Sequence, residues 1–121
     1  MERRSWGKKF ADAFRGMALA MWGQSSFAVH GIIALAVLAA SAYLRVTTTD
    51  FVLLLLCITL VLVAETFNSS LERLAKAVDC NPNADLGAAL DISSAAVLWA
   101  ALGAASIGLI VLLPYLMRFP L

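Results

Sequence analysis

The chain has 121 residues, of which 62% are hydrophobic and 14% charged, and its mean hydropathy is +0.88. This length allows one domain at most, and the composition departs so far from that of soluble domains that part of the chain must have lipid as its solvent. The net charge of +1 gives no indication of a nucleic-acid partner.

The N-terminal segment predicts an amphipathic helix over residues 6–22 that lies in the membrane interface. Aromatic residues and methionines share this segment with basic residues, a composition typical of interfacial helices. Because Asp12 and Arg15 interrupt the apolar surface, we do not expect a cleavable signal peptide. The Gly-Gln-Ser-Ser stretch at 23–26 breaks or bends the helix, and one of its serines is expected to cap the next helix.

Residues 27–44 predict the first membrane span. The run has no formal charge, and its length is near the lower limit for crossing a hydrocarbon core of about 30 Å. His30 is interpreted as a helix-end residue at the membrane interface, because neither cysteine lies near it in the sequence to suggest a metal site. Residues 45–50 predict a short polar turn.

The second span is predicted over residues 51–67, and its helical pattern continues to about residue 77. Turn signals, Asn-Pro and Gly, then mark residues 79–87 as the clearest loop in the chain. If one helix joins Cys57 to Cys80, they lie roughly 35 Å apart, at about 1.5 Å per residue. We therefore expect no disulfide between them.

The third span is predicted over residues 92–113. Asp91 stands at its start, where a carboxylate caps free N–H groups and meets the positive helix end. Pro114 is expected to end the helix, and Arg118 to anchor the tail. Small residues that recur every four positions allow close helix packing; these are Ala96, Ala100, Ala104 and Gly108.

The distribution of lysine and arginine predicts the orientation. Most of the nine lie on one side of the predicted spans: Arg3, Arg4, Lys8, Lys9, Arg15, Arg73 and Lys76. Only Arg45 and Arg118 lie on the other side. The positive-inside rule then places the N-terminus and residues 65–91 in the cytoplasm and the C-terminus outside.

The stretch that carries the chemistry is residues 64–72, directly after the second apolar run. A carboxylate attached to a membrane-length helix is costly and usually marks a functional site. In a continuous helix Glu65, Asn68 and Glu72 share one face. Such oxygen ligands suit Mg²⁺, which usually takes one or two carboxylates together with substrate phosphates. For Glu72 alone, a solvated position at the wet end of the helix is the simpler interpretation.

The sequence resembles the small prokaryotic diacylglycerol kinase and undecaprenol kinase family over nearly all of its length. Residues 64–72, Ala-Glu-Thr-Phe-Asn-Ser-Ser-Leu-Glu, match the family pattern of Glu, two residues, Asn-Ser/Thr, two residues and Glu. Residues 90–98 match the region of the family's Lys-Asp and small-residue run. Residues 13–16, Ala-Phe-Arg-Gly, resemble the aromatic-x-Gly of its surface helix.

The resemblance implies an all-α integral membrane protein with a surface helix and three spans, assembled as a homotrimer with sites shared between subunits. It implies an ATP- and Mg²⁺-dependent kinase of the bacterial inner membrane that phosphorylates a lipid alcohol, diacylglycerol or undecaprenol. By the same resemblance, Glu65 is the general base, Asn68 positions the substrate and Glu72 binds Mg²⁺. Ser94 joins Glu65 at the lipid substrate.

The resemblance also implies nucleotide contacts, which involve Asp12, Gln24, Glu72, Asn81, Pro82, Asn83, Leu90 and Asp91. Three positions depart from the family pattern. Gln24 replaces a metal-binding Glu, Leu90 replaces a Lys that contacts phosphate, and Lys76 stands at an acidic position. An amide oxygen such as that of Gln24 can ligate a metal ion, but it brings no charge.

Two other functions fit the sequence. A kinase-like membrane protein without catalysis, acting as a binding or assembly module, is favoured by Gln24 and Leu90. A small transporter would use Glu65 as a proton or ion carrier. The intact set of Glu65, Asn68 and Glu72 favours the enzyme. Diacylglycerol and undecaprenol remain open as acceptors, because both present a primary hydroxyl at the same depth.

Overall fold

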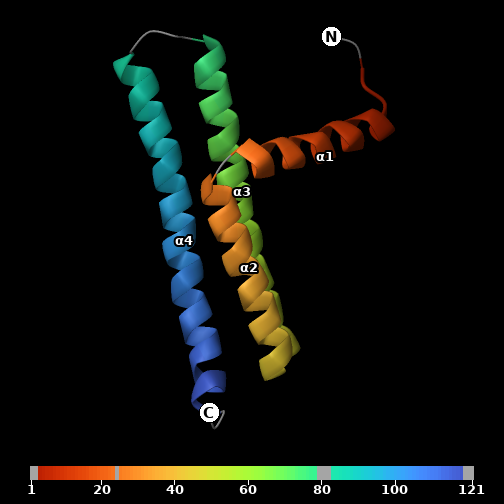
Figure 1. Ribbon diagram of the computed structural model, residues 1–121, viewed down its shortest axis with the longest axis vertical. Helices are drawn as coiled ribbons and strands as arrows, with labels where there is room; N and C mark the ends of the chain where they lie inside the picture. The colour runs from red at the N-terminus through yellow and green to blue at the C-terminus, as the bar shows by residue number, and fades with distance from the viewer. Residues whose placement is uncertain (1–2, 24, 79–82, 119–121) are drawn as a thin grey trace.

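The computed structural model describes residues 3–23, 25–78 and 83–118, which form four α-helices (Figure 1). They are α1 (Trp6–Gly23), α2 (Ser25–Leu44), α3 (Thr48–Val78) and α4 (Ala84–Arg118). α2, α3 and α4 are each long and apolar enough to cross a membrane. The protein is therefore an all-helical membrane protein with three candidate spans.

The three long helices run side by side, while α1 points away from them at a steep angle near the start of α2 (Figure 1). Large side chains along α1 are exposed, among them those of Trp6, Phe10 and Phe14. A membrane interface would cover these side chains. The location of α1 in that interface remains a prediction.

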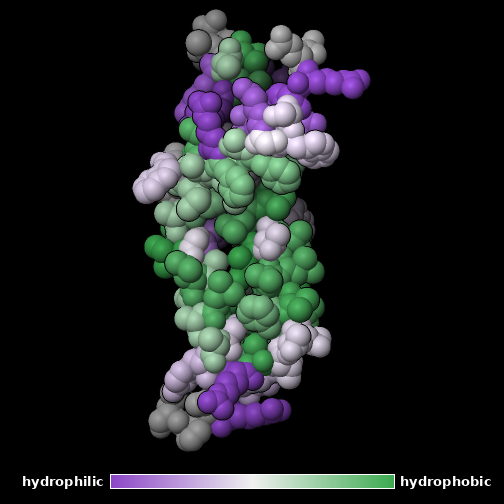
Figure 2. Space-filling view, turned by 90° about the vertical axis from the view of Figure 1, so that its right-hand side faces the viewer, coloured by the Kyte–Doolittle hydropathy of each residue, from purple (hydrophilic) through white to green (hydrophobic). Residues whose placement is uncertain are grey.

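α3 is the central helix, because each of the other three packs more extensively against α3 than against any other helix, α4 most of all. The buried apolar side chains of α3 are few, and Leu54, Cys57 and Val61 lie on one face at helical spacing. Most large apolar residues of α2 and α4 are exposed. Figure 2 shows a hydrophobic belt between two hydrophilic ends, the surface expected of a chain that lies in lipid.

The start of α4 corrects two expectations from the sequence. Residues 84–87 are helical and do not belong to a loop, and Asp91 lies inside the helix instead of capping it. The cap is Asn83, whose Oδ1 accepts hydrogen bonds from the backbone N–H groups of Asp85 at 2.9 Å and Leu86 at 3.1 Å. An asparagine in this position satisfies the free donors of the first turn, so the helix begins two turns earlier than expected.

Pro114 was expected to end the last helix, but α4 continues through it to Arg118. Proline removes one backbone donor, and membrane helices tolerate this where neighbouring groups hold the chain. Here Tyr115 anchors the last turn, because its hydroxyl donates to Asp50 Oδ2 at 2.5 Å and accepts a hydrogen bond from Thr47 N at 3.1 Å.

The polar turn between the first two spans is shorter than expected, since α3 already begins at Thr48. Thr47 caps α3 through a hydrogen bond from Asp50 N to its Oγ1 at 3.2 Å. Arg45 has a φ of 52°, the left-handed conformation that commonly ends a helix. α2 and α3 are thus joined by a tight connection, which fixes their antiparallel arrangement.

Candidate functional site

Glu65 is the most buried charged residue in the described part of the chain, with 0% of its surface exposed. Burying a carboxylate is costly unless polar partners compensate. Glu65 has two such partners on α2. Ser26 donates its hydroxyl to Glu65 Oε2 at 3.2 Å, and His30 Nδ1 lies 2.6 Å from Glu65 Oε1.

The two partners reach the same carboxylate because Ser26 and His30 are four residues apart and share one face of α2. That face packs against α3 at the height of Glu65. The His30 contact is close, yet neither His30 Nδ1 nor Glu65 Oε1 has a hydrogen bond of normal geometry. Active-site hydrogen bonds are often poorly aligned without substrate and tighten when it binds.

The pairing of His30 with Glu65 corrects the interpretation of His30 as a helix-end residue at the membrane interface. The ring lies in the second turn of α2, and its side chain is 21% exposed. Sequence reasoning missed this pair because its residues lie 35 positions apart on different helices. The only local signal was the i, i+4 spacing of Ser26 and His30, which says nothing about α3.

Asn68 and Glu72 form a second polar network, directed toward α4. Asn68 Nδ2 donates to Glu72 Oε1 at 3.2 Å, and Ser93 on α4 donates its hydroxyl to Asn68 Oδ1 at 2.5 Å. Asn68 and Ser93 are both buried, whereas Glu72 is half-buried. The residues predicted to share one face of α3 therefore contact different helices. Glu65 contacts α2, and Asn68 contacts α4. Ser93 is a site residue that the sequence did not single out.

The remaining predicted site residues lie around this centre or beyond the described residues. Asp91 and Ser94 are exposed on α4, and Leu90 is half-buried there. Asp12 of α1 forms an exposed ion pair with Arg4, 2.7 Å between Nη1 and Oδ2. The predictions for Gln24, Asn81 and Pro82 fall outside the described residues. Asn83 is described, as the cap of α4.

A magnesium ion was expected here, and the described residues offer few ligands for it. They contain no group of three or more His, Cys, Asp or Glu side chains that could hold a metal ion. Mg²⁺ often needs only one or two carboxylates, because substrate phosphates and water supply its other oxygens. The half-buried carboxylate of Glu72 fits this mode of binding, in which the ion arrives with the nucleotide.

An apolar groove of about 650 Å³ runs along α2, α3 and α4. His30 lies at its upper end on α2, and the other walls are apolar, with Ile33, Val37, Leu54 and Leu116 among them. Glu65 is not part of the wall. The groove can hold a hydrocarbon chain whose polar end reaches His30.

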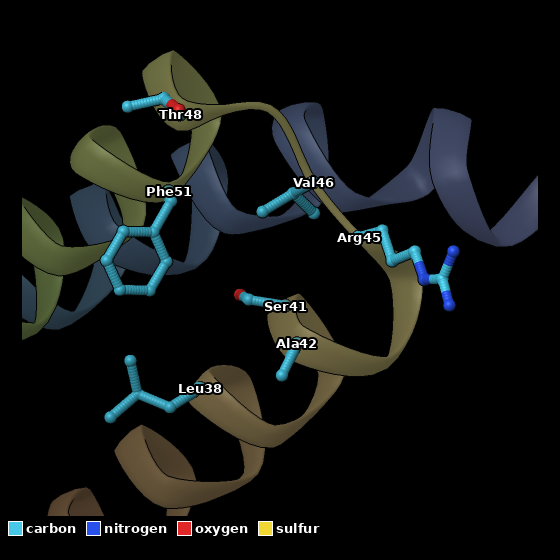
Figure 3. Close-up of a pocket in the computed structure, with 7 residues that line it drawn as sticks. All are labelled: Leu38, Ser41, Ala42, Arg45, Val46, Thr48 and Phe51. Carbon is cyan, nitrogen blue, oxygen red and sulfur yellow. The ribbon is translucent and has the colours of Figure 1, made fainter.

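A second hollow, of about 320 Å³, lies at the connection between α2 and α3 (Figure 3). Figure 3 shows that the guanidinium of Arg45 points away from it. The hydroxyl of Ser41, another lining residue, donates to the carbonyl of Val37 at 2.7 Å. Neither the Arg45 guanidinium nor the Ser41 hydroxyl is therefore directed into this hollow.

The fold and these contacts define a multi-span helical membrane protein in which a buried carboxylate contacts a histidine at the upper end of an apolar groove. A family model described as prokaryotic diacylglycerol kinase matches residues 11–112. The chain belongs to this family, which implies a lipid kinase and confirms the resemblance seen in the sequence. A comparison with curated proteins found no match.

Proposed function

We propose that the protein is an ATP- and Mg²⁺-dependent kinase that phosphorylates the hydroxyl of a membrane lipid alcohol, diacylglycerol or undecaprenol. The observation that carries this proposal is the fully buried Glu65, whose contact His30 lies at the upper end of an apolar groove, in a chain of the prokaryotic diacylglycerol kinase family. A lipid in the groove would bring its hydroxyl close to His30 and to the buried Glu65 carboxylate that His30 contacts.

In the proposed reaction, the lipid O–H bond breaks and the oxygen forms a bond to the γ-phosphorus of ATP. The bond between that phosphorus and the β,γ-bridging oxygen breaks, and ADP leaves with the electron pair. The Glu65 carboxylate, as general base, takes up the hydroxyl proton. Asn68, held between Glu72 and Ser93, positions the reacting groups, which is the main task of an enzyme in phosphoryl transfer.

Glu72, with Gln24 as a second ligand, is proposed to hold the Mg²⁺ that arrives with ATP. When bound, such an ion neutralises charge on the transferred phosphate. Asp12, Leu90, Asp91 and residues 81–83 are proposed to contact the nucleotide, and Ser94 the lipid. Of these, Glu72 lies on α3, and Asp91 and Ser94 lie on α4. All three lie beyond the groove, toward the helix ends that are proposed to face the cytoplasm.

The proposal extends to topology and assembly. The N-terminus and the junction of α3 with α4 lie in the cytoplasm of a bacterium, where ATP is present, and the protein is a homotrimer in the cell membrane. Support comes from the uneven distribution of Lys and Arg. A nine-span bundle would also cover apolar and polar surface that one chain leaves exposed. Crosslinking in mild detergent tests the trimer, and a monomer of full activity would contradict it.

A second candidate function is a membrane module that binds ligands without catalysis. Gln24 and Leu90 favour it, because they remove a metal-binding charge and a phosphate-binding charge from the family pattern. The deciding experiment incubates purified protein with radiolabelled ATP, with and without Mg²⁺, and with a panel of lipid alcohols. The kinase proposal expects Mg²⁺-dependent label in one class of lipid. Nucleotide binding without transfer to any lipid would favour the module.

A further inference from the structure

The end of α4 that lies at the site carries acidic groups and no basic one. Within α4, all of which the structure describes, Asp85 and Asp91 stand near the start, and the one basic residue, Arg118, lies in the last turn at the far end. Glu72 adds a further carboxylate from α3. A nucleotide triphosphate is itself strongly negative, so its binding here requires a cation besides the Mg²⁺ that Glu72 is proposed to hold.

The contact between Asn68 and Ser93 fixes which turns of α3 and α4 lie at the same height. The two helices run in opposite directions (Figure 1), and the Ser93 hydroxyl donates to Asn68 Oδ1 at 2.5 Å. Glu72 on α3 and Leu90 on α4 each lie about one turn from this contact, toward the junction of the two helices. The half-buried Leu90 therefore presents an apolar side chain at the height of Glu72.

Lys76 is the basic residue of α3 that can reach this height. It follows Glu72 by four residues, so both lie on one face of the helix. Long side chains on a helix lean toward its N-terminus and cover the turn before their own Cα, which brings the Lys76 amine back toward Glu72. Lys76 is exposed and forms no ion pair within residues 3–23, 25–78 and 83–118.

Other basic residues match this position less well. Arg73 is next to Glu72 in the sequence, and neighbours on a helix do not share a face. The basic residues of α1 belong to a helix that points away from the three long helices (Figure 1). Two cations of the N-terminal segment already have partners, since Arg4 pairs with Asp12 and Lys9 lies 4.6 Å from the centre of a tryptophan ring.

We propose that Lys76 binds the phosphates of the nucleotide and so supplies from α3 the positive charge that Leu90 does not supply from α4. This inference rests on the proposed kinase function and names a further nucleotide-binding residue for it. An ammonium group binds phosphate as a point charge with three donors, so it can act from a different helix. Together with the ion that Glu72 holds, Lys76 neutralises negative charge on the phosphates during transfer.

The first test measures binding and needs no turnover. Purified protein in lipid nanodiscs is titrated with a non-hydrolysable ATP analogue in the presence of Mg²⁺, and Lys76→Gln is compared with Arg73→Gln. Both substitutions remove one positive charge from an exposed position at the same end of α3, so their effects on topology and long-range attraction are alike. We expect Lys76→Gln to weaken binding about tenfold, the effect of one charge-assisted hydrogen bond, and Arg73→Gln to bind like the wild type. Equal affinities of the two variants would overturn the proposal.

The second test separates Lys76 from the metal site. Because the lost contact is to phosphate and not to the ion, high Mg²⁺ should leave the affinity of Lys76→Gln low, whereas it should partly restore that of Glu72→Gln. Lys76→Arg keeps the charge and should retain most of the affinity. Full restoration of Lys76→Gln by Mg²⁺ would show that Lys76 acts through the ion, which contradicts a direct contact with phosphate.

The third test moves the cation to the other helix. Leu90→Lys, added to Lys76→Gln, should recover most of the lost affinity, because it places an ammonium group at the same height on α4. No recovery in a double variant that unfolds like the wild type would show that the two positions do not serve the same phosphates. Wild-type affinity in Lys76→Gln would refute the role of Lys76 and leave the kinase proposal standing. A wild type that binds the analogue but transfers phosphate from ATP to no lipid would instead refute the kinase proposal.

Discussion

Tyr115 and Asp50 join the end of α4 to the start of α3, with 2.5 Å between the tyrosine hydroxyl and Asp50 Oδ2. The same hydroxyl accepts a hydrogen bond from Thr47 N. The Tyr115 side chain therefore binds both Asp50 and Thr47, at the start of α3. This contact lies 15 residues before Glu65 along α3. It holds the two most extensively packed helices in register and so contributes to the placement of the site.

Tyr115→Phe should lower the stability of the protein without changing its chemistry. The substitution leaves Asp50 and Thr47 N without their shared partner, and losing such bonds costs about 1–3 kcal/mol. Unfolding in mixed micelles, followed by circular dichroism, measures the change. The control is Ser106→Ala, which removes a hydroxyl that donates to Leu102 within α4. Equal stability of Tyr115→Phe and Ser106→Ala would show that the hydrogen bonds of the Tyr115 hydroxyl do not stabilise the fold.

Ser93→Ala should disturb the site itself. Ser93 is buried and donates to Asn68 Oδ1, so the substitution leaves a buried amide oxygen unpaired. We expect a loss of about 1–3 kcal/mol in stability and a lower turnover, because Asn68 is no longer fixed. Ser106→Ala again serves as the control. Full turnover of Ser93→Ala in the lipid-phosphorylation assay would contradict the proposal that a fixed Asn68 positions the reacting groups.

Glu72→Gln and Glu65→Gln should fail in different ways. Glu72→Gln removes a charge from the proposed metal site, so its defect should appear in Mg²⁺ and nucleotide affinity and be partly relieved by high Mg²⁺. Glu65→Gln should keep nucleotide affinity and lose turnover by about 10²–10⁴-fold. A titration of Mg²⁺ for both variants separates them. Rescue of Glu65→Gln by Mg²⁺ would mean that the two roles are assigned wrongly.

Local pattern was enough to predict much of this architecture. Uninterrupted apolar runs indicated three spans, and the motif at residues 64–72 indicated where the polar site begins. The ends of helices were harder, because Asn83 and Thr47 act as caps through side-chain contacts that composition does not reveal. Pro114 was misjudged because a long-range hydroxyl contact, that of Tyr115, holds the helix beyond it. His30 was misread for the same reason, since its meaning comes from Glu65 on another helix.

Gly108 tests whether the groove holds the lipid. A Cβ built on Gly108 meets no atom within 4 Å, although the residue lines the groove. The small-residue stripe of α4 therefore makes no close helix contact at this point within one chain, and a larger side chain can enter the groove without displacing the backbone. Gly108→Leu should narrow the path of a hydrocarbon chain and raise the KM for the lipid several-fold, while nucleotide affinity stays unchanged.

Gly103→Leu is the matched control for this substitution. Gly103 lies on the same helix, a Cβ there also meets nothing within 4 Å, and the residue does not line the groove. Both substitutions replace glycine by leucine in a helix, so their effect on helix propensity is alike, at about 1 kcal/mol in favour of the helix. A difference in KM between the two variants then comes from the groove. If both raise the KM equally, the lipid does not use this groove, and its hydroxyl must reach His30 and Glu65 by another path.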